Sequence, residues 1–279
     1  MTKSDLPPSN QPEADYVLGT HDEELQRLGL QHRVWRPRAS DAWRRAGFTA
    51  GQTLLDVGAG PGYATVDLAE IVGEQGQVVA LERSARFLAA MKEAASVRGL
   101  TNITTYQLDL DTDKLPELLV DGVWARWVFA FLKKPHELLG RIARALKPGG
   151  VIVIHEYFDY GTWRSVDRSE LHDEFVQTVM RTWRDSGGEP DIALDLLGWI
   201  EDAGMHIEST RTIVDVISPT DYAWQWPKSF IDINLRHLVS GGSLQQERAD
   251  AIREEFAALE SKQHARMITP GVLEIIARK

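Results

Sequence analysis

The sequence predicts an α/β protein: a Rossmann-like, mostly parallel sheet of seven strands with helices on both faces. Three observations lead to this fold class. Seven short apolar runs have the character of strands, helical segments alternate with the first five of them, and a glycine-rich turn follows the first. Strands joined through helices pair in parallel with right-handed crossovers.

The strands are expected where short apolar runs are bounded by turn residues. The KPGG turn at 147–150 introduces the fifth run, and a turn interrupts the last one. The expected strands are 52–57, 77–82, 103–108, 122–128, 151–157, 205–217 and 267–279.

Helices are expected where apolar residues recur at helical spacing behind a capping residue. Thr20 with Glu23 and Ser243 with Gln246 have the spacing of capping pairs, and Ser84 precedes a further helix. The expected helices are 20–35, 39–46, 61–71, 84–97, 135–147, 168–184, 191–204 and 243–262.

The chain divides into an N-terminal segment, 1–46, and a main domain, 47–279. The strand–helix alternation loosens near 158–190 and 218–265, which we expect to form helical cap insertions over the sheet. Within the second cap, the run YAWQWPKSF at 222–230 is either the wall of a substrate pocket or core of the cap.

Composition limits the partners of the protein. Forty-one acidic residues against 31 basic ones give a formal charge of −10, which argues against nucleic acid as a partner. The absence of cysteine excludes disulfides, zinc thiolate sites and cysteine nucleophiles. We see no membrane span and no secretion signal, and therefore expect a cytoplasmic protein. A homodimer is one expectation for its assembly.

The glycine turn lies in LLDVGAGPG, residues 54–62. Gly58, Gly60 and Gly62 would let the backbone approach a ligand, and the following helix would offer free N–H groups to an anion. The spacing is GxGxG, and Tyr63 follows where the dinucleotide fingerprint continues differently. A plain strand-to-helix turn is the alternative interpretation.

Acidic residues follow the next two strands. Glu82 ends the second strand, 20 residues after Gly62, where a carboxylate can accept both hydroxyls of a ribose. Asp109 follows the third strand and could accept from the amino group of an adenine, although Asp111 and Asp113 compete for that role. Solvated strand-end carboxylates or loop caps are the simpler alternatives.

Four segments together resemble the class I S-adenosylmethionine-dependent methyltransferases: LLDVGAGPG (54–62), VVALERS (78–84), the strand end at Asp109, and RIARALKPGG (141–150). The run WARWVFAFLKKP (124–135) is similar to the branch with ubiquinone, menaquinone and many natural-product methyltransferases. The resemblance covers about 45–160 strongly, and 190–217 and 267–279 in outline.

The resemblance implies S-adenosylmethionine as the cofactor and assigns roles by position. Glu82 would bind the ribose hydroxyls, and Asp109 with the backbone of Leu110 would meet the adenine edge, beside which Arg83 would pack. The family often has glycine where this chain has Leu108, which weakens the Asp109 assignment. The methionine part would lie against Asp56, Gly58, Gly60, Gly62, Arg126 and Trp127. No set of residues resembles a metal-dependent methyltransferase site.

The same resemblance implies that the N-terminal segment is a helical lid over the cofactor. Tyr16 would cover the methionine end, and Gln31 and Arg33 would reach the cofactor carboxylate. Ordinary helix packing or a solvated polar face is the alternative for each of the three.

Catalysis would require alignment of nucleophile, methyl carbon and sulfur, which alone can contribute about 7–11 kcal/mol. Tyr16, Trp35 and Trp127 are candidates to face the sulfonium. His155, near the end of the fifth strand, is the candidate general base, because its ordinary pKa lies near neutrality. Strand alternation would turn only one of His155 and Glu156 toward the pocket. A core histidine is the alternative.

The sequence thus favours a methyltransferase that acts on a small-molecule acceptor, with the choice of O, N or C nucleophile open. The alternatives are a non-catalytic S-adenosylmethionine-binding regulatory subunit and a protein methyltransferase. A nicotinamide-dependent oxidoreductase is disfavoured by Tyr63, which stands where its glycine pattern differs.

Overall fold

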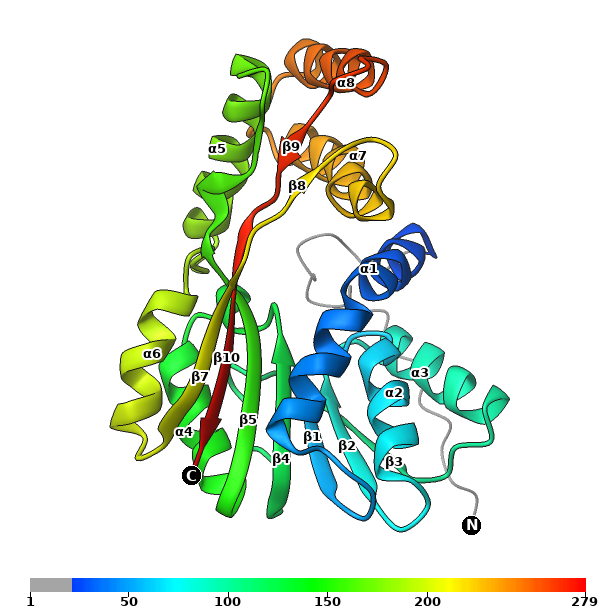
Figure 1. Cartoon of the computed structure of the whole chain (residues 1–279), viewed down its shortest axis with the longest axis vertical. Helices are drawn as coiled ribbons and strands as arrows, with labels where there is room; N and C mark the ends of the chain where they lie inside the picture. The colour runs from blue at the N-terminus through cyan, green and yellow to red at the C-terminus, as the bar shows by residue number, and fades with distance from the viewer. Residues whose placement is uncertain (1–21) are drawn as a thin grey trace, which may run out of the picture.

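A seven-stranded sheet forms the centre of the computed structural model, which describes residues 22–279 (Figure 1). Its strands are β1 (Thr53–Val57), β2 (Gln77–Glu82), β3 (Ile103–Gln107), β4 (Val120–Arg126), β5 (Leu146–Asp159), β7 (His206–Ile213) and β10 (Gly271–Arg278). Their order across the sheet is β3-β2-β1-β4-β5-β10-β7. Only β10 runs antiparallel to its neighbours, so the predicted mostly parallel sheet is confirmed.

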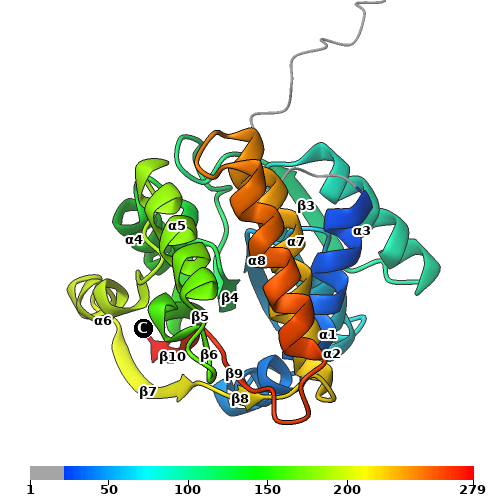
Figure 2. The same ribbon diagram turned by 90° about the horizontal axis from the view of Figure 1, so that it is seen from above.

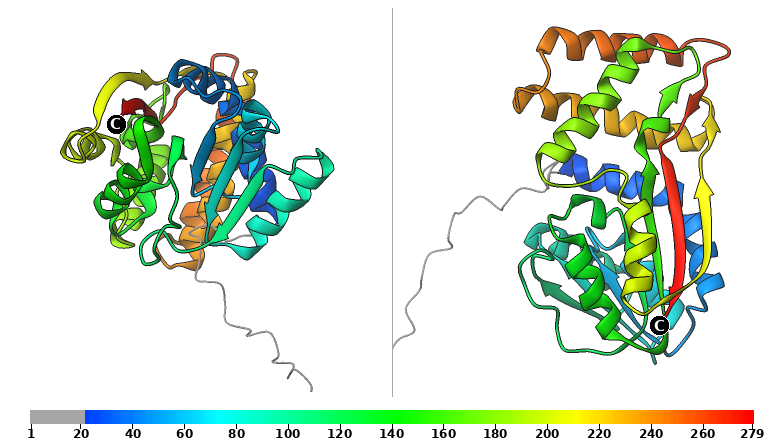
Figure 3. Two further views of the ribbon diagram at one scale, coloured as in Figure 1. Left: turned by 90° about the horizontal axis from the view of Figure 1, so that it is seen from below. Right: turned by 90° about the vertical axis from the view of Figure 1, so that its left-hand side faces the viewer.

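Helices cover both faces of this sheet, as predicted (Figures 2 and 3). One face carries α1 (Asp22–Ala46), α2 (Tyr63–Val72) and α3 (Ala85–Val97). The other carries α4 (Pro135–Ala145) and α6 (Ala193–Asp202). Ser84 caps α3, because its hydroxyl accepts from the Phe87 N–H at 3.2 Å, as expected from the sequence.

A cap stands beyond the carboxyl ends of the parallel strands (Figure 1). It contains α5 (Glu170–Asp185), α7 (Gln225–Ser240) and α8 (Gln246–Glu260). A second small sheet, β6 (Arg164–Ser165), β9 (Met267–Ile268) and β8 (Val216–Ile217), lies at its base. The expected strands 205–217 and 267–279 each leave the main sheet to supply one of these short strands.

The two helices expected before residue 46 are one helix, α1, which continues through Pro37 and changes direction along its length (Figure 1). Proline removes a backbone donor and bends a helix, which accounts for the change of direction. The apolar stripe of Trp35, Ala39 and Trp43 crosses the proline and is fully buried. Packing of this stripe on the sheet therefore keeps the two halves as one helix.

The second cap was expected to be helical, but the bounds of α7 within it were not predicted. Pro227 lies in the first turn of α7, where a missing N–H costs nothing. Burial of Trp226, Ile231, Asn234 and Leu238 follows one helical face. The run 222–230 therefore includes cap core. Its hydrophobic spacing from 226 onward was the signal that could have identified the helix.

The other capping expectations gave mixed results. Ser243 does not cap α8, whose N-cap residue is Gln245 and has no side-chain cap bond. The expected pair of Thr20 and Glu23 falls partly outside the described residues. The KPGG turn appears as a shift of register within β5, where pairing with β4 moves from Leu146 to Val151.

Candidate cofactor site

A cavity of about 510 Å³ lies at the carboxyl ends of β1, β2 and β4, against α1. Ligand pockets typically have volumes of about 300–1,000 Å³. Parallel α/β sheets bind ligands at this edge. Ten of the residues predicted from the sequence line it: Gln31, Asp56, Gly58, Gly60, Glu82, Arg83, Asp109, Leu110, Arg126 and Trp127.

Four predicted residues are not among those that line the cavity. Gly62 packs against Met91 of α3. Arg33 donates from its Nε to the Tyr222 hydroxyl at 3.0 Å. His155 is buried within the sheet. Tyr16 lies outside the described residues.

The glycine turn is held by close packing as well as by conformation. Gly62 has φ 84° and serves as the N-cap of α2. A Cβ at Gly62 would lie 2.2 Å from Cγ of Met91 on α3, so the glycine permits contact between the turn and α3. Gly60 has φ 57°, and a Cβ there would meet nothing within 4 Å. Gly62 thus serves packing, whereas Gly60 borders open cavity.

Glu82 connects the glycine turn to the end of β2. One carboxylate oxygen accepts from the Gly60 N–H at 2.9 Å, and the other accepts from the Ser84 N–H at 2.8 Å. Burial raises the pKa of Glu82, and the backbone N–H groups of Ser84, Gly60 and Arg83 oppose that rise. With three of its roughly four acceptor positions used, the carboxylate can still accept from a hydroxyl group of a ligand.

Asp56, near the end of β1, is buried and accepts from the Thr65 hydroxyl at 2.6 Å. Burial raises the pKa of Asp56 to about 7, and the charge of Arg126 partly opposes the rise. Asp56 therefore exchanges its proton near neutrality at the floor of the cavity.

The three aspartates in the loop after β3 make different contacts. Asp109 and Asp111 line the cavity, and Asp113 does not. Asp111 accepts from the N–H groups of Lys133 and Lys134, each at 3.0 Å, which joins the loop to the segment after β4. Asp113 accepts from the Asp109 N–H at 2.8 Å. Asp109 thus lines the cavity just after the end of β3.

Arg126 and Trp127 end β4 at the opposite end of the cavity from Asp109. Trp127 has φ 52°, which is uncommon for a bulky residue, and its N–H donates to the His155 carbonyl at 2.9 Å. Its indole stacks on Tyr157 at 5.5 Å and on Trp226 at 5.8 Å between ring centroids. Backbone strain of this kind is often found at functional sites.

His32 was not predicted, yet it lines the cavity from α1. Its Nε2 lies 3.0 Å from Oδ2 of Asp67 on α2, and its Nδ1 lies 3.3 Å from Nη2 of Arg126. Burial lowers the pKa of His32, despite its bond to Asp67. The sequence signal was the i, i+4 spacing of Leu28 and His32, which puts both on the face of α1 toward the cavity.

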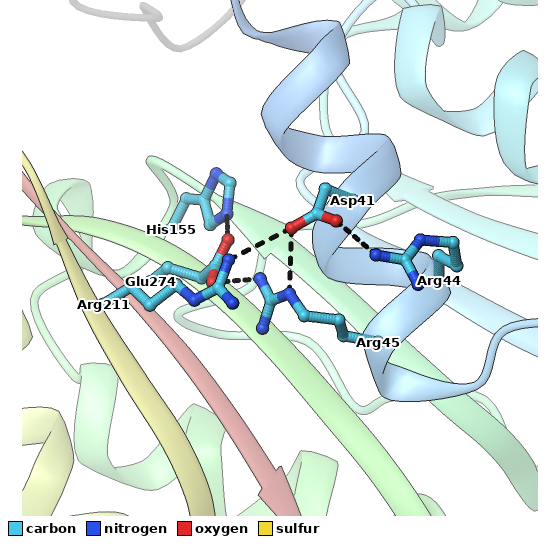
Figure 4. A network of polar contacts seen from close by, with 6 residues as sticks. All are labelled: Asp41, Arg44, Arg45, His155, Arg211 and Glu274. Carbon is cyan, nitrogen blue, oxygen red and sulfur yellow. Dashed lines mark hydrogen bonds and ion pairs between the residues drawn. The ribbon is translucent and has the colours of Figure 1, made fainter.

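The structure does not bring His155, the predicted general base, to the cavity. Its Nε2 lies 3.1 Å from Oε2 of Glu274 (Figure 4). His155 is fully buried, and Trp35 and Trp124 pack around it. Burial lowers its pKa. β5 is covered on both faces, so alternation turns neither His155 nor Glu156 toward open space.

Glu156 has a structural role instead. One of its carboxyl oxygens accepts from the N–H groups of Val128 and Phe129, at 2.6 and 2.7 Å, and holds the chain after Trp127. Burial raises the pKa of Glu156 to about 8. Residues 22–279 contain no cluster of three or more His, Asp or Glu that could hold a metal ion. Nor does any helix in this range have the length and apolar character that a membrane crossing requires.

The mixed sheet, with its glycine turn and strand-end acids, defines the class I S-adenosylmethionine-dependent methyltransferases. Residues 48–192, more than half of the chain, match the family described as a methyltransferase domain. The chain belongs to this methyltransferase family.

Curated relatives include the ubiquinone/menaquinone biosynthesis C-methyltransferase UbiE of Yersinia enterocolitica, 27% identical over 135 residues, which are 48% of this chain and 52% of the relative. UbiE of Yersinia pestis (strain Pestoides F) is 26% identical over the same length, with the same shares. The chain thus spans about half the length of the curated relatives that it matches.

Solved structures share the fold. A putative methyltransferase from Bacillus halodurans has a TM-score of 0.59 at 16% identity, covering 86% of this chain and 97% of its own. The [4+2]-cyclase SpnF has a TM-score of 0.57 at 19% identity, covering 87% and 80%. Coclaurine N-methyltransferase, bound to N-methylheliamine and SAH, has a TM-score of 0.53 at 18% identity, covering 85% and 70%.

Proposed function

We propose that this protein transfers the methyl group of S-adenosylmethionine to a small-molecule acceptor. The observation that carries the proposal is the cavity itself. In a chain of this family, it joins the glycine turn, Glu82 and Asp109 along one sheet edge. A single extended ligand with a ribose in its middle would contact all three.

The residues present fit this cofactor. Glu82 keeps acceptor capacity for a ribose hydroxyl, and Leu108 and Leu110 offer apolar contact for an adenine near Asp109. At the other end, Arg126 has an unpartnered Nη1 that suits a carboxylate. When bound, the cofactor supplies a methyl group on a sulfonium, which is already an activated leaving group.

The protein's own contribution would be binding, orientation and exclusion of water. In this proposal α1 is the lid, because Leu28, Gln31 and His32 all line the cavity from that helix. Trp127 borders the cavity on the side of the cap, and aromatic faces near a sulfonium can contribute about 0.5–2 kcal/mol. With His155 buried, the proposal assigns no general base.

A small acceptor is favoured over a macromolecule by the cover above this end of the cavity. Trp35, Trp127 and Trp226 contact one another with centroid distances of 5.0–5.8 Å and join α1, β4 and α7. A protein or nucleic-acid segment would have to displace this cluster, whereas a small planar molecule would need only to displace one ring.

A non-catalytic binding role is the second candidate. The fold is shared with the [4+2]-cyclase SpnF, so the fold does not by itself fix methyl transfer. The contacts among Trp35, Trp127 and Trp226 are compatible with a binding role.

Calorimetric titration with S-adenosylmethionine, S-adenosylhomocysteine and NADH tests the cofactor first. Micromolar binding of the two sulfur compounds without NADH binding is expected. A screen of phenols, amines and quinone precursors for methyl incorporation then tests the transfer. Binding without turnover on any acceptor would favour the second candidate, and no binding by folded protein would contradict the proposal.

A further inference from the structure

Arg126 carries a buried guanidinium nitrogen that no protein group uses. Arg126 lines the cavity, and its Nη1 is buried with no hydrogen-bond partner. Its guanidinium lies over the rings of Trp124 and Trp127, at 5.6 and 5.1 Å from their centroids. The charge of Asp56 acts on Arg126, but no carboxylate within residues 22–279 forms an ion pair with it. Buried donors are normally paired, so Nη1 is available to an anionic ligand.

Two neighbouring residues fix the direction of this guanidinium. Asp67 accepts from Nε of Arg36 at 2.7 Å and lies 3.0 Å from Nε2 of His32. A charged Asp67 needs a donor, so we assign the histidine proton to Nε2. Nδ1 is then a lone pair, which can accept from Nη2 of Arg126 at 3.3 Å. This contact occupies one arm of the guanidinium and leaves Nη1 for a ligand.

We propose that Arg126 binds the carboxylate of the cofactor, and that His32 and Asp67 are the positioning residues that hold its guanidinium in place. The inference rests on the proposed function and assigns one group of the ligand to one atom of the chain. Guanidinium–carboxylate bonds are charge-assisted and stronger than neutral ones.

The assignment displaces the earlier expectation for the N-terminal helix. Arg33 was expected to reach this carboxylate, but its Nε donates to Tyr222 and it does not line the cavity. Gln31 lines the cavity, yet its Oε1 accepts from Arg27 at 2.7 Å. Because His32 lies on α1 and Asp67 on α2, a bound carboxylate would also link the lid to the helix that follows the glycine turn.

The test compares two ligands that differ only in the carboxylate: S-adenosylhomocysteine and S-adenosyl-3-thiopropylamine. The unmodified protein should bind the first at least about tenfold more tightly, as expected for a charge-assisted bond. Arg126→Gln should reduce this ratio to near one by weakening only S-adenosylhomocysteine. Arg33→Gln changes an arginine of α1 that does not line the cavity, so it is the matched control and should leave the ratio unchanged.

The positioning role is tested by a second pair. His32→Gln keeps an acceptor for Arg126 and a donor for Asp67, and should retain much of the ratio, whereas His32→Leu should lose it. Thermal unfolding of every variant identifies those that do not fold, and Arg126→Lys is the substitute if Arg126→Gln fails.

The outcomes separate the two levels of inference. If the unmodified protein binds S-adenosylhomocysteine but shows no preference over the amine, or if Arg126→Gln keeps the preference, the carboxylate assignment is overturned and the proposed function stands. If Arg33→Gln alone removes the preference, Arg33 is the ligand instead. If folded protein binds neither compound, the proposed function is overturned together with this inference.

Discussion

Glu274 on β10 accepts a hydrogen bond from His155 on the adjacent strand β5, with 3.1 Å between Oε2 and Nε2. Its other oxygen pairs with Arg45 of α1. Asp41 extends the network on α1 by accepting from Arg45, Arg44 and Arg211 (Figure 4). This set of contacts fastens the second half of α1 to the middle of the sheet.

Glu274→Ala should be strongly destabilising, because it leaves His155 and Arg45 without their shared partner. Removing one member of a buried pair costs about 3–5 kcal/mol. Arg44→Ala removes an exposed partner of Asp41 from the same network and should cost at most about 1 kcal/mol. Urea unfolding at pH 7 measures both. If Glu274→Ala loses no more unfolding free energy than Arg44→Ala, the buried contacts of Glu274 add no more stability than an exposed ion pair.

His155→Gln should leave the pH dependence of methyl transfer unchanged. The imidazole is buried behind Trp35 and Trp124, so it cannot exchange a proton with an acceptor in the cavity. Loss of packing should appear as a lower midpoint in thermal unfolding. The measurement is kcat against pH for both proteins. If one limb of the kcat–pH profile is present in the unmodified protein and absent in His155→Gln, His155 is the general base after all.

Gly62→Ala and Gly60→Ala form a matched pair with different expected effects. Both residues have positive φ, which costs an L-residue about 1–2 kcal/mol. Only the methyl at position 62 collides with Met91, and overpacking adds about 1–3 kcal/mol. Gly62→Ala should therefore lower stability more. Gly60→Ala should chiefly weaken cofactor binding. Unfolding and calorimetric titration of both variants check this, and a reversed order would contradict the packing role of Gly62.

His172 should make the protein less stable in acid. Burial lowers its pKa from 6.5 to about 4, and its Nε2 has no partner among the described residues. The unfolded state therefore binds the proton more readily between these values, so stability falls as pH drops from 6.5 to 4. The full effect is about 3 kcal/mol. Above pH 6.5 the imidazole is mostly neutral in both the folded and the unfolded state, so it does not lower the stability there.

His172→Phe isolates that contribution. A phenyl ring suits the contacts with Trp163 and Phe175, so stability at pH 7 should change little. The difference in unfolding free energy between the two proteins should grow toward pH 4, with the variant more stable in acid. Parallel curves from pH 7 to pH 4 would rule out His172 as the acid-sensitive group.

Much of the site was predictable because its residues follow strands. Asp56, Glu82 and Asp109 come at or next to the ends of apolar runs, and parallel strands bring such ends to one edge. The turn glycines were recognisable from their spacing. Nine of the ten predicted residues that line the cavity lie at or just after strands, and Gln31 is on α1.

The errors share a different cause. His155 looked like a base because its strand end lies near the expected pocket, but burial depends on what covers both faces of β5. His32 was overlooked because its partners, Asp67 and Arg126, lie 35 and 94 residues away. The two helices expected before residue 46 are one, because tertiary packing carries α1 through Pro37.

The sheet, its glycine turn and the class of ligand can be inferred from the sequence, because they depend on local periodicity and on residues that follow strands directly. Which polar groups are paired and which stay open depends on the tertiary structure. It turned His155 toward Glu274, turned Arg126 into the cavity, and linked Arg126 through His32 to Asp67. Partners distant in the chain meet only when helices and sheet pack, and that packing sets the burial and charge on which the chemistry depends.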